Sequence, residues 1–290
     1  NNLKGKISEL KSIPTDQIFL GNGSDEVLDL IFRLFCIPGK DAVITAPPTY
    51  GMYKVLAGIN NVFVKEVLLN SEFQINNQSI LKTYDRSTKI LFLCSPNNPV
   101  GISLNEELVI DIIDQFPGIV VIDEAYIDFS EQSSFSGLIN EKSNLIVVQT
   151  LSKAWGMAGI RLGMALTNSY IVSALNKIKP PYNVNTLTQR EALKRLSDGT
   201  SFENNKESIL NERTRMHAFL EALPIVKKVF KSDANFLLVR FDDPKYYFEK
   251  LKKEGIVVRD RSNQIGCEGC LRITIGTPQE NNRLIKSLRS

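Results

Sequence analysis

Short apolar segments that alternate with amphipathic helical segments constrain the fold of this chain more than any other feature of its sequence. They recur between residues 18 and 167, and most end in glycine, proline or hydroxyl-rich residues. The strands predicted in this way are 18–20, 42–45, 62–69, 89–94, 118–122, 145–149 and 163–167. Repeats of strand, helix and strand form mostly parallel sheets with helices on both faces. The sequence therefore predicts an α/β fold with a mostly parallel central sheet flanked by helices.

A proline-rich break over residues 180–185 interrupts this pattern and is typical of a connection between domains. The elements predicted beyond it are helices over 186–197, 202–223, 244–253 and 279–288 and strands over 235–241, 256–259 and 271–275. We therefore expect a large domain over residues 14–183 and a smaller α+β C-terminal domain over residues 184–290. Residues 1–13 are expected to form a residual N-terminal helix.

Composition argues against several classes of protein. The excess of 35 basic over 32 acidic residues gives a net charge of only +3, without a basic and aromatic cluster, so no nucleic-acid partner is expected. No apolar stretch has the length of a membrane helix, and no secretory signal stands out. Four cysteines are few for a disulfide scaffold and suggest a reducing cytoplasm. Cys267 and Cys270 have zinc-knuckle spacing, but with His217 as the single histidine no metal site is expected.

One lysine stands directly after the predicted strand over 145–149. Lys153 follows two hydroxyl residues, Thr150 and Ser152, and Arg161 comes eight residues later among small residues. At the mouth of a buried strand, desolvation lowers the pKa of an amine and makes it a nucleophile toward carbonyl groups. The hydroxyls and the guanidinium would hold a phosphate beside it. Alternatively, Lys153 and Arg161 are ordinary surface residues at a strand-to-loop junction. This stretch alone does not decide between the two interpretations.

Two turns of the first half have either a binding or a purely structural interpretation. In Gly21-Asn22-Gly23-Ser24-Asp25-Glu26 the free amides at a helix start would bind a phosphate, although Ser24 and Asp25 equally fit a helix cap. Tyr50, held between prolines and a glycine, would present its ring to a flat ligand or simply pack.

Polar residues at two further strand ends are also candidates. Asn98 lies in a turn stiffened by Pro96 and Pro99, at the end of a buried strand where open α/β sheets bind ligands. Asp123 directly follows the most apolar strand of the chain and is costly to bury unless it meets a cation.

The order of these motifs resembles the aspartate-aminotransferase-like (fold type I) pyridoxal-phosphate enzymes of the class II subfamily, and more narrowly the histidinol-phosphate aminotransferases. The resemblance covers essentially all 290 residues. The motifs that carry it are G-N-G-S-D-E, P-T-Y-G-M-Y, S-P-N-N-P-V-G, D-E-A-Y, T-L-S-K-A-W-G-M-A-G-I-R-L-G and V-R-D-R-S-N…C-L-R-I-T-I-G-T. It implies a cofactor, pyridoxal 5'-phosphate, bound by the large domain.

The resemblance also implies residue roles. Lys153 forms the Schiff base with the cofactor and transfers the proton, Asp123 pairs with the ring nitrogen, and Asn98 and Tyr126 reach the phenolic oxygen. Tyr50 stacks on the ring. The residues implied around the cofactor phosphate are Ser24, Asp25, Thr150, Ser152 and Arg161.

The implied reaction transfers an amino group between L-histidinol phosphate and 2-oxoglutarate, giving imidazole-acetol phosphate and glutamate in histidine biosynthesis. Arg272 is implied to take the glutamate carboxylate and help hold the substrate phosphate, with Arg259 as a second phosphate contact. A surface ion pair with Asp260 is the alternative for Arg259. Asn183 is a further candidate for contact with substrate or cofactor.

Three implications concern the assembly and the start of the chain. The family resemblance implies a cytoplasmic homodimer, with small molecules as the other partners. Asn1-Asn2-Leu3-Lys4 lacks an initiator Met and reads like the inside of a helix, so we expect a preceding arm to be missing. In such enzymes this arm covers the substrate and supplies a Tyr to the partner subunit's cofactor phosphate.

Other activities are compatible with the same residues. An aromatic aminotransferase or a threonine-phosphate decarboxylase on this scaffold would retain Lys153 and Asp123. A non-catalytic pyridoxal-phosphate-sensing domain of a transcription regulator would require an attached basic helix-turn-helix segment, which these 290 residues do not contain.

Overall fold

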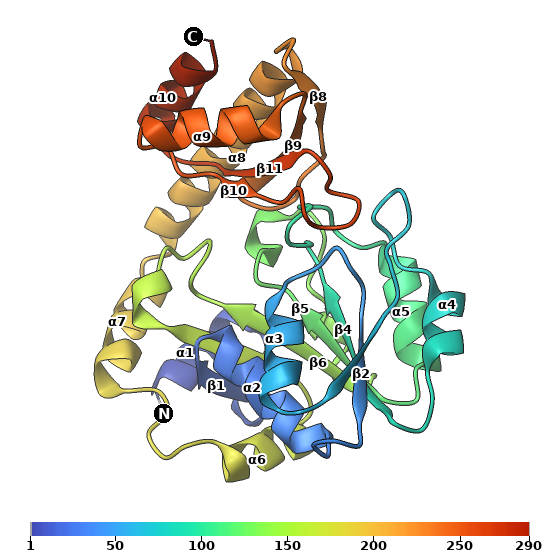
Figure 1. Ribbon diagram of the computed structural model, residues 1–290. Coiled ribbons are helices and arrows are strands. Elements are labelled where there is room, and N and C mark those ends of the chain that lie inside the picture. Colours follow the sequence, from blue (N-terminus) through green and yellow to red (C-terminus); the bar gives the residue numbers. More distant parts are fainter. Residues whose placement is uncertain (1, 290) are drawn as a thin grey trace.

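The computed structural model describes residues 2–289, which form a large body and a smaller one (Figure 1). The α-helices are α1 (Asn2–Lys11), α2 (Ser24–Phe35), α3 (Met52–Ile59), α4 (Asn77–Thr83), α5 (Glu106–Gln115), α6 (Ser169–Ile178), α7 (Thr186–Leu196), α8 (Gly199–Glu221), α9 (Pro244–Lys253) and α10 (Pro278–Arg289). The strands are β1 (Ile18–Asn22), β2 (Ala42–Thr45), β3 (Phe63–Glu66), β4 (Thr88–Cys94), β5 (Ile119–Asp123), β6 (Leu145–Thr150), β7 (Leu162–Leu166), β8 (Val226–Val229), β9 (Phe236–Phe241), β10 (Arg259–Asp260) and β11 (Cys270–Thr274).

The large body is built on a seven-stranded sheet in the order β1-β7-β6-β5-β4-β2-β3. Neighbouring strands from β3 through β6 pair in parallel, whereas β7 pairs antiparallel with both β6 and β1. Strand β7 therefore runs against the other six. The predicted α/β fold with a mostly parallel sheet is confirmed.

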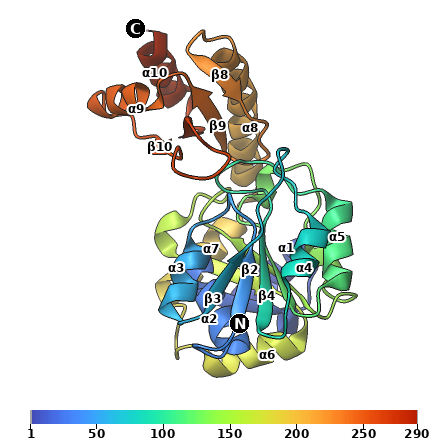
Figure 2. The same ribbon diagram turned by 45° about the vertical axis from the view of Figure 1, so that its right-hand side comes forward.

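Both faces of this sheet are covered by helices (Figure 2). Alternate residues of the central strands enter two different cores: Leu91 and Val120 lie in one, and Phe92 and Val121 lie in the other. Because each face of a parallel sheet must be buried, these strands are apolar at nearly every position. The carboxyl ends of the strands are thereby fixed at one edge, toward the small body.

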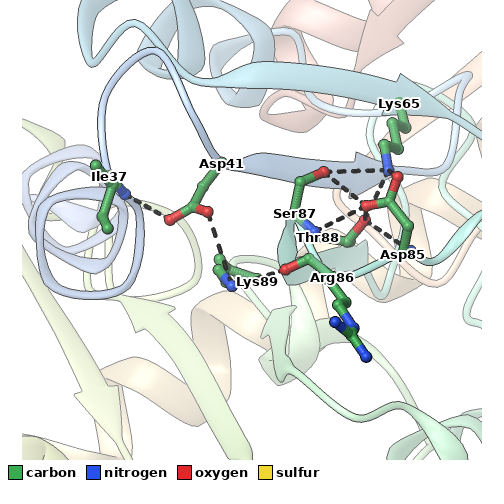
Figure 3. Close-up of polar contacts among 8 residues, drawn as sticks. All are labelled: Ile37, Asp41, Lys65, Asp85, Arg86, Ser87, Thr88 and Lys89. Atoms are coloured by element: carbon green, nitrogen blue, oxygen red, sulfur yellow. Dashed lines mark hydrogen bonds and ion pairs between the residues drawn. The ribbon is translucent and has the colours of Figure 1, made fainter.

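A polar network holds the opposite edge of the sheet (Figure 3). Lys65 of β3 lies 2.7 Å from an oxygen of Asp85, in the turn before β4. Asp41, just before β2, accepts a hydrogen bond from the backbone N–H of Ile37 at 2.7 Å and lies 3.7 Å from Lys89 Nζ. The hydrogen bonds from Lys65 and from neighbouring Ser87 hold the pKa of Asp85 well below its usual range. These contacts fix where the strands begin, away from the strand ends that carry the predicted site.

The small body contains an antiparallel sheet in the order β10-β11-β9-β8. Helix α8 covers it through Met216 and Leu220, which share a core with strand residues such as Leu237. Helix α7 instead packs on α1, and its Ala192 belongs to a core of the large body. The domain boundary between residues 183 and 184 stays a prediction, and packing favours a division within α8. Within residues 2–289 no helix is long and apolar enough to span a membrane.

Candidate active site

A cavity of about 510 Å³ lies where the carboxyl ends of the large sheet's strands meet the small body. Its lining includes every residue that the sequence predicts for the site except Asn183. The predicted residues found there are Ser24, Asp25, Tyr50, Asn98, Asp123, Tyr126, Thr150, Ser152, Lys153, Arg161, Arg259 and Arg272. The fold thus gathers into one cavity residues that are up to 248 positions apart, between Ser24 and Arg272.

Asp123 ends strand β5 and is almost fully buried, with 3% of its surface exposed. Its Oδ2 accepts a hydrogen bond from the Tyr53 hydroxyl at 3.0 Å, and its Oδ1 accepts one from the backbone N–H of Ala125 at 3.1 Å. Burial raises the pKa of Asp123 to about 6, although both hydrogen bonds oppose the shift. A cation next to this carboxylate would compensate the cost of its burial.

Lys153 follows strand β6, as the strand-end position predicts. Its Nζ lies 5.2 Å from the centre of the Tyr126 ring. Burial lowers the pKa of Lys153, and the positive charge of Arg272 lowers it further, while Asp123 opposes the shift. The amine is therefore easier to deprotonate, and so more nucleophilic, than an exposed lysine.

The start of α2 forms a cradle for an anion beside Lys153. The N-cap residue is Gly23, so no side chain occupies the free amides of the first turn. A Cβ at Gly163 of β7 would lie 2.2 Å from the Ser24 backbone nitrogen, and one at Gly23 would lie 2.5 Å from Arg161 Nη2. Arg161 has a left-handed backbone (φ 55) and places Nη2 3.7 Å from Asp25 Oδ2. Backbone amides and a guanidinium converge there, a combination suited to a phosphate.

Two hydroxyls border the same cradle. Thr150 Oγ1 lies 3.0 Å from Ser152 Oγ and accepts a hydrogen bond from the Ser152 backbone N–H at 3.1 Å. Opposite them, the Tyr50 hydroxyl donates to Asp25 Oδ1 at 3.1 Å, and the Tyr50 ring meets the Tyr53 ring edge-on at 5.6 Å. These contacts fix Tyr50 at the cavity wall, where its ring is available to a planar ligand.

The small body contributes a cationic face. Arg259 of β10 is the register partner of Arg272 of β11, so both side chains lie on the same face of the sheet. Arg272 Nη1 donates to Asn98 Oδ1 at 2.5 Å, and its guanidinium lies 4.8 Å from the Phe236 ring centre. Within residues 2–289, neither arginine forms an ion pair with a carboxylate. Among the described residues, no carboxylate therefore balances the charge of this face.

Asn183 lies outside the cavity. Its side-chain amide donates to the carbonyl oxygen of Leu20 at 3.0 Å and to Glu26 Oε2 at 2.8 Å. The amide thereby ties the predicted linker to β1 and α2. A contact of Asn183 with substrate or cofactor stays a prediction, without support from its position.

Further residues belong to the site without being predicted, among them Tyr53, Arg261 and Gln264. Tyr53 donates to Asp123, and Arg261 and Gln264 line the cavity. Tyr53 follows Tyr50 by three positions, the spacing of neighbours on a helix, and Arg261 follows Arg259 by two, the spacing of one strand face. Both spacings are visible in the sequence once Tyr50 and Arg259 are candidates.

Comparison with known proteins identifies the family. The family description that matches residues 2–288 is "Aminotransferase class I and II". The chain belongs to this family. Among relatives of this aminotransferase, the histidinol-phosphate aminotransferase of Flavobacterium psychrophilum is 51% identical over 288 residues, which cover 99% of this chain and 83% of the relative.

Solved aminotransferase structures have the same fold. The histidinol-phosphate aminotransferase from Clostridium acetobutylicum superimposes with a TM-score of 0.91 at 28% identity, over 99% of this chain and 87% of that one. The enzyme from Sinorhizobium meliloti, solved in complex with pyridoxal-5'-phosphate, gives a TM-score of 0.88 at 22% identity, over 99% and 81% of the two chains. The fold type expected from the sequence motifs is thus confirmed.

Proposed function

We propose that this protein is a pyridoxal-phosphate-dependent histidinol-phosphate aminotransferase of histidine biosynthesis. It transfers an amino group between L-histidinol phosphate and 2-oxoglutarate, with imidazole-acetol phosphate and glutamate as products. The charge of the cavity is the observation that carries the proposal. Its lining contains five cationic side chains, Lys153, Arg161, Arg259, Arg261 and Arg272, against two carboxylates, Asp25 and Asp123, a difference of three charges. Two phosphate groups, one on the cofactor and one on the substrate, would balance this excess.

The residues of the large body fit the cofactor. Gly23 and Gly163 leave no room for a Cβ at the start of α2, which keeps the amides and Arg161 open to a phosphate. We assign the cofactor phosphate to Ser24, Asp25, Thr150, Ser152 and Arg161. Tyr50 would stack on the cofactor ring, and Asn98 and Tyr126 would donate to its phenolic oxygen.

When bound, pyridoxal phosphate supplies an aldehyde that condenses with amines and a protonated ring that withdraws electrons from the reacting carbon of the substrate. Lys153 Nζ is the amine that would bond to that aldehyde and, once released, would move the proton of the substrate's reacting carbon. Asp123 would hold a proton on the ring nitrogen, and its buried position would make that pairing strong. Tyr53 keeps the Asp123 carboxylate oriented through the 3.0 Å hydrogen bond.

The small body would select the substrate. We assign to Arg272 the carboxylate of glutamate or 2-oxoglutarate and part of the histidinol phosphate group, with Arg259 as a further phosphate contact. Binding of an anion to this face offsets the cost of holding unpaired guanidinium groups close together. The face is thus suited to an anionic substituent that lies away from the reacting carbon.

A half-reaction tests cofactor, lysine and substrate together. Addition of L-histidinol phosphate alone to the cofactor-loaded enzyme is expected to convert the visible absorbance of the lysine-bound cofactor to that of its amine form. Further addition of 2-oxoglutarate is expected to restore the first spectrum and yield glutamate. Glutamate formation from phenylalanine but not from histidinol phosphate would refute the substrate assignment in favour of an aromatic aminotransferase. Release of CO₂ from threonine phosphate would instead indicate a decarboxylase.

We further propose that the enzyme is a cytoplasmic homodimer. All four cysteines are buried free thiols, as expected in a reducing compartment. Val55, which lines the cavity, is 50% exposed on α3, and Ile59 of the same helix is 66% exposed. A second copy that covers this apolar face would also close the cavity wall. A monomeric mass at a concentration that gives full activity would refute the dimer.

A further inference from the structure

Arg261 extends the cationic face of the small body beyond the two arginines predicted from the sequence. The Arg261 backbone N–H donates to the carbonyl oxygen of Cys270 at 2.9 Å, which continues the ladder in which Arg259 opposes Arg272. Residues two apart on a strand point to the same face. Arg259, Arg261 and Arg272 therefore share one face, and all three line the cavity.

In the part of the chain that the structure describes, no carboxylate pairs with Arg261. Among residues 2–289 it forms no ion pair, and its buried Nε has no hydrogen-bond partner. The carboxylate next to it in sequence, Asp260, accepts a hydrogen bond from the Ser262 backbone N–H at 2.8 Å, and its side chain belongs to the opposite face of the strand. Partial burial of a guanidinium without a counterion costs free energy, and a bound anion reduces this cost.

The neighbouring Arg272 is already engaged. Its Nη1 donates to Asn98 Oδ1 at 2.5 Å, and its guanidinium packs over Phe236, so its position is set by the large body and the small core together. One guanidinium satisfies a carboxylate with two parallel hydrogen bonds. A phosphate ester carries nearly one more negative charge and a third terminal oxygen, which call for an additional donor.

We propose that Arg261 is a specificity-determining residue that contacts the phosphate of the amino donor and has no role toward dicarboxylate substrates. This inference rests on the proposed function and adds the residue by which one site distinguishes a phosphate ester from a carboxylate. The same pocket can then accept histidinol phosphate and glutamate in turn, since glutamate is held by Arg272 without Arg261.

The test compares L-histidinol phosphate with L-histidinol, which differ only in the phosphate, and includes glutamate as a dicarboxylate donor. The rate constant at low substrate, kcat/KM, is measured for L-histidinol phosphate, for L-histidinol and for glutamate in half-reactions of the cofactor-loaded enzyme. Arg261→Gln is expected to lower kcat/KM for histidinol phosphate about 10- to 100-fold, the weight of a hydrogen bond to a charged group, mainly through KM. The values for histidinol and for glutamate are expected to stay within about twofold of wild type.

Matched variants separate recognition from damage. Arg33→Gln removes an arginine from the surface of α2, where it pairs with Asp29, and is expected to change none of the three values. Arg261→Lys keeps the charge without the forked geometry and is expected to restore part of the preference. Equal losses for histidinol phosphate, histidinol and glutamate in Arg261→Gln would overturn the inference in favour of a structural role.

Two outcomes have different meanings. A wild-type enzyme that does not prefer histidinol phosphate over histidinol would refute the proposed substrate itself. A wild-type preference that Arg261→Gln retains in full would refute the role of Arg261 and leave the proposed function standing.

Discussion

The two walls of the cavity are built on different principles. On the large-body wall, polar groups bond to one another: Asp123 accepts from Tyr53 and Ala125, and Tyr50 donates to Asp25. On the small-body wall, Arg259 and Arg261 form no ion pairs among residues 2–289. The first wall is organised before any ligand binds, which suits groups that carry out the chemistry. The second depends on an anion to balance its charge, which suits the selection of substrates.

Among changes to the large-body wall, removal of the Lys153 amine should lower activity the most. Lys153→Ala is expected to lower kcat by about 10⁴-fold or more, because among residues 2–289 no other amine lines the cavity to bond to the cofactor. Steady-state formation of glutamate measures the effect. Lys153→Arg, which keeps a positive charge, should be equally inactive. Substantial activity in either variant would assign the chemistry to another group.

The packing of this wall is tested by an added methyl group. Gly163→Ala places a Cβ 2.2 Å from the Ser24 nitrogen and is expected to weaken cofactor binding about 10- to 100-fold, because the start of α2 must shift. Gly159→Ala is the matched control, since nothing lies within 4 Å of its Cβ. Absorbance titrations give the cofactor Kd, and thermal unfolding checks that both variants fold. Equal affinities would show that the cradle is not rigid.

Burial of the Asp123 carboxylate in the large-body wall should lower the free energy of unfolding. The pKa of Asp123 is about 6 in the folded protein and about 4 in an unfolded chain, so stability falls as pH rises through this interval. Asp123→Asn is therefore expected to stabilise the cofactor-free protein by about 3 kcal/mol at pH 8 and by little at pH 4. Urea unfolding at both pH values measures it, with exposed Glu141→Gln as the control. A destabilised Asp123→Asn protein at pH 8 would contradict the assignment.

A smaller effect is expected from the hydroxyl behind Asp123. The hydrogen bond from Tyr53 holds the pKa of Asp123 down, so Tyr53→Phe should raise it by about one unit. As the pH is lowered, cofactor affinity would then begin to fall about one pH unit earlier, and below both pKa values it would be about tenfold weaker than in the wild type. Tyr84→Phe, at a ring that packs on Phe116, is the control. An unshifted pH profile would mean that Tyr53 only fills space.

The smallest expected effect on folding stability lies on the small-body wall. Burial lowers the pKa of the Arg272 guanidinium. Arg272→Met removes this positive charge and keeps a long side chain over Phe236. We expect the free energy of unfolding of the ligand-free protein to change by less than about 1 kcal/mol, while affinity for 2-oxoglutarate falls strongly. Thermal unfolding and substrate titration measure the two quantities. A large loss of stability would show that this wall, too, is held by its own contacts.

The sequence predicts the large-body wall better than the rest because its residues follow apolar strands. Asp123 ends β5 and Lys153 lies in the turn after β6, and strand ends of a parallel sheet meet at one edge. The Tyr53 contact joins helix α3 to β5 and depends on tertiary packing, so the spacing from Tyr50 indicates the residue but not its hydrogen bond to Asp123. Asn183 fits the motif order, yet the fold directs its amide to Glu26.

The small body is predicted less completely, since its elements are short. Strand β8 reads Val-Lys-Lys-Val and carries too little apolar signal, and it is not predicted. The strand predicted over 256–259 contains only Arg259 in the structure, because β10 is the two-residue pair Arg259–Asp260. A pairing of two residues is fixed by its neighbour β11 and not by its own sequence.

The close approach of β7 to the start of α2 also limits how this gene can change. At Gly163 even the smallest side chain would collide with the backbone of Ser24, 139 positions away. A single-nucleotide change from a glycine to an alanine codon there would affect cofactor affinity without altering any group that touches a reactant. Random mutagenesis with selection for growth without histidine should therefore leave this codon nearly invariant and that of Gly159 free to vary.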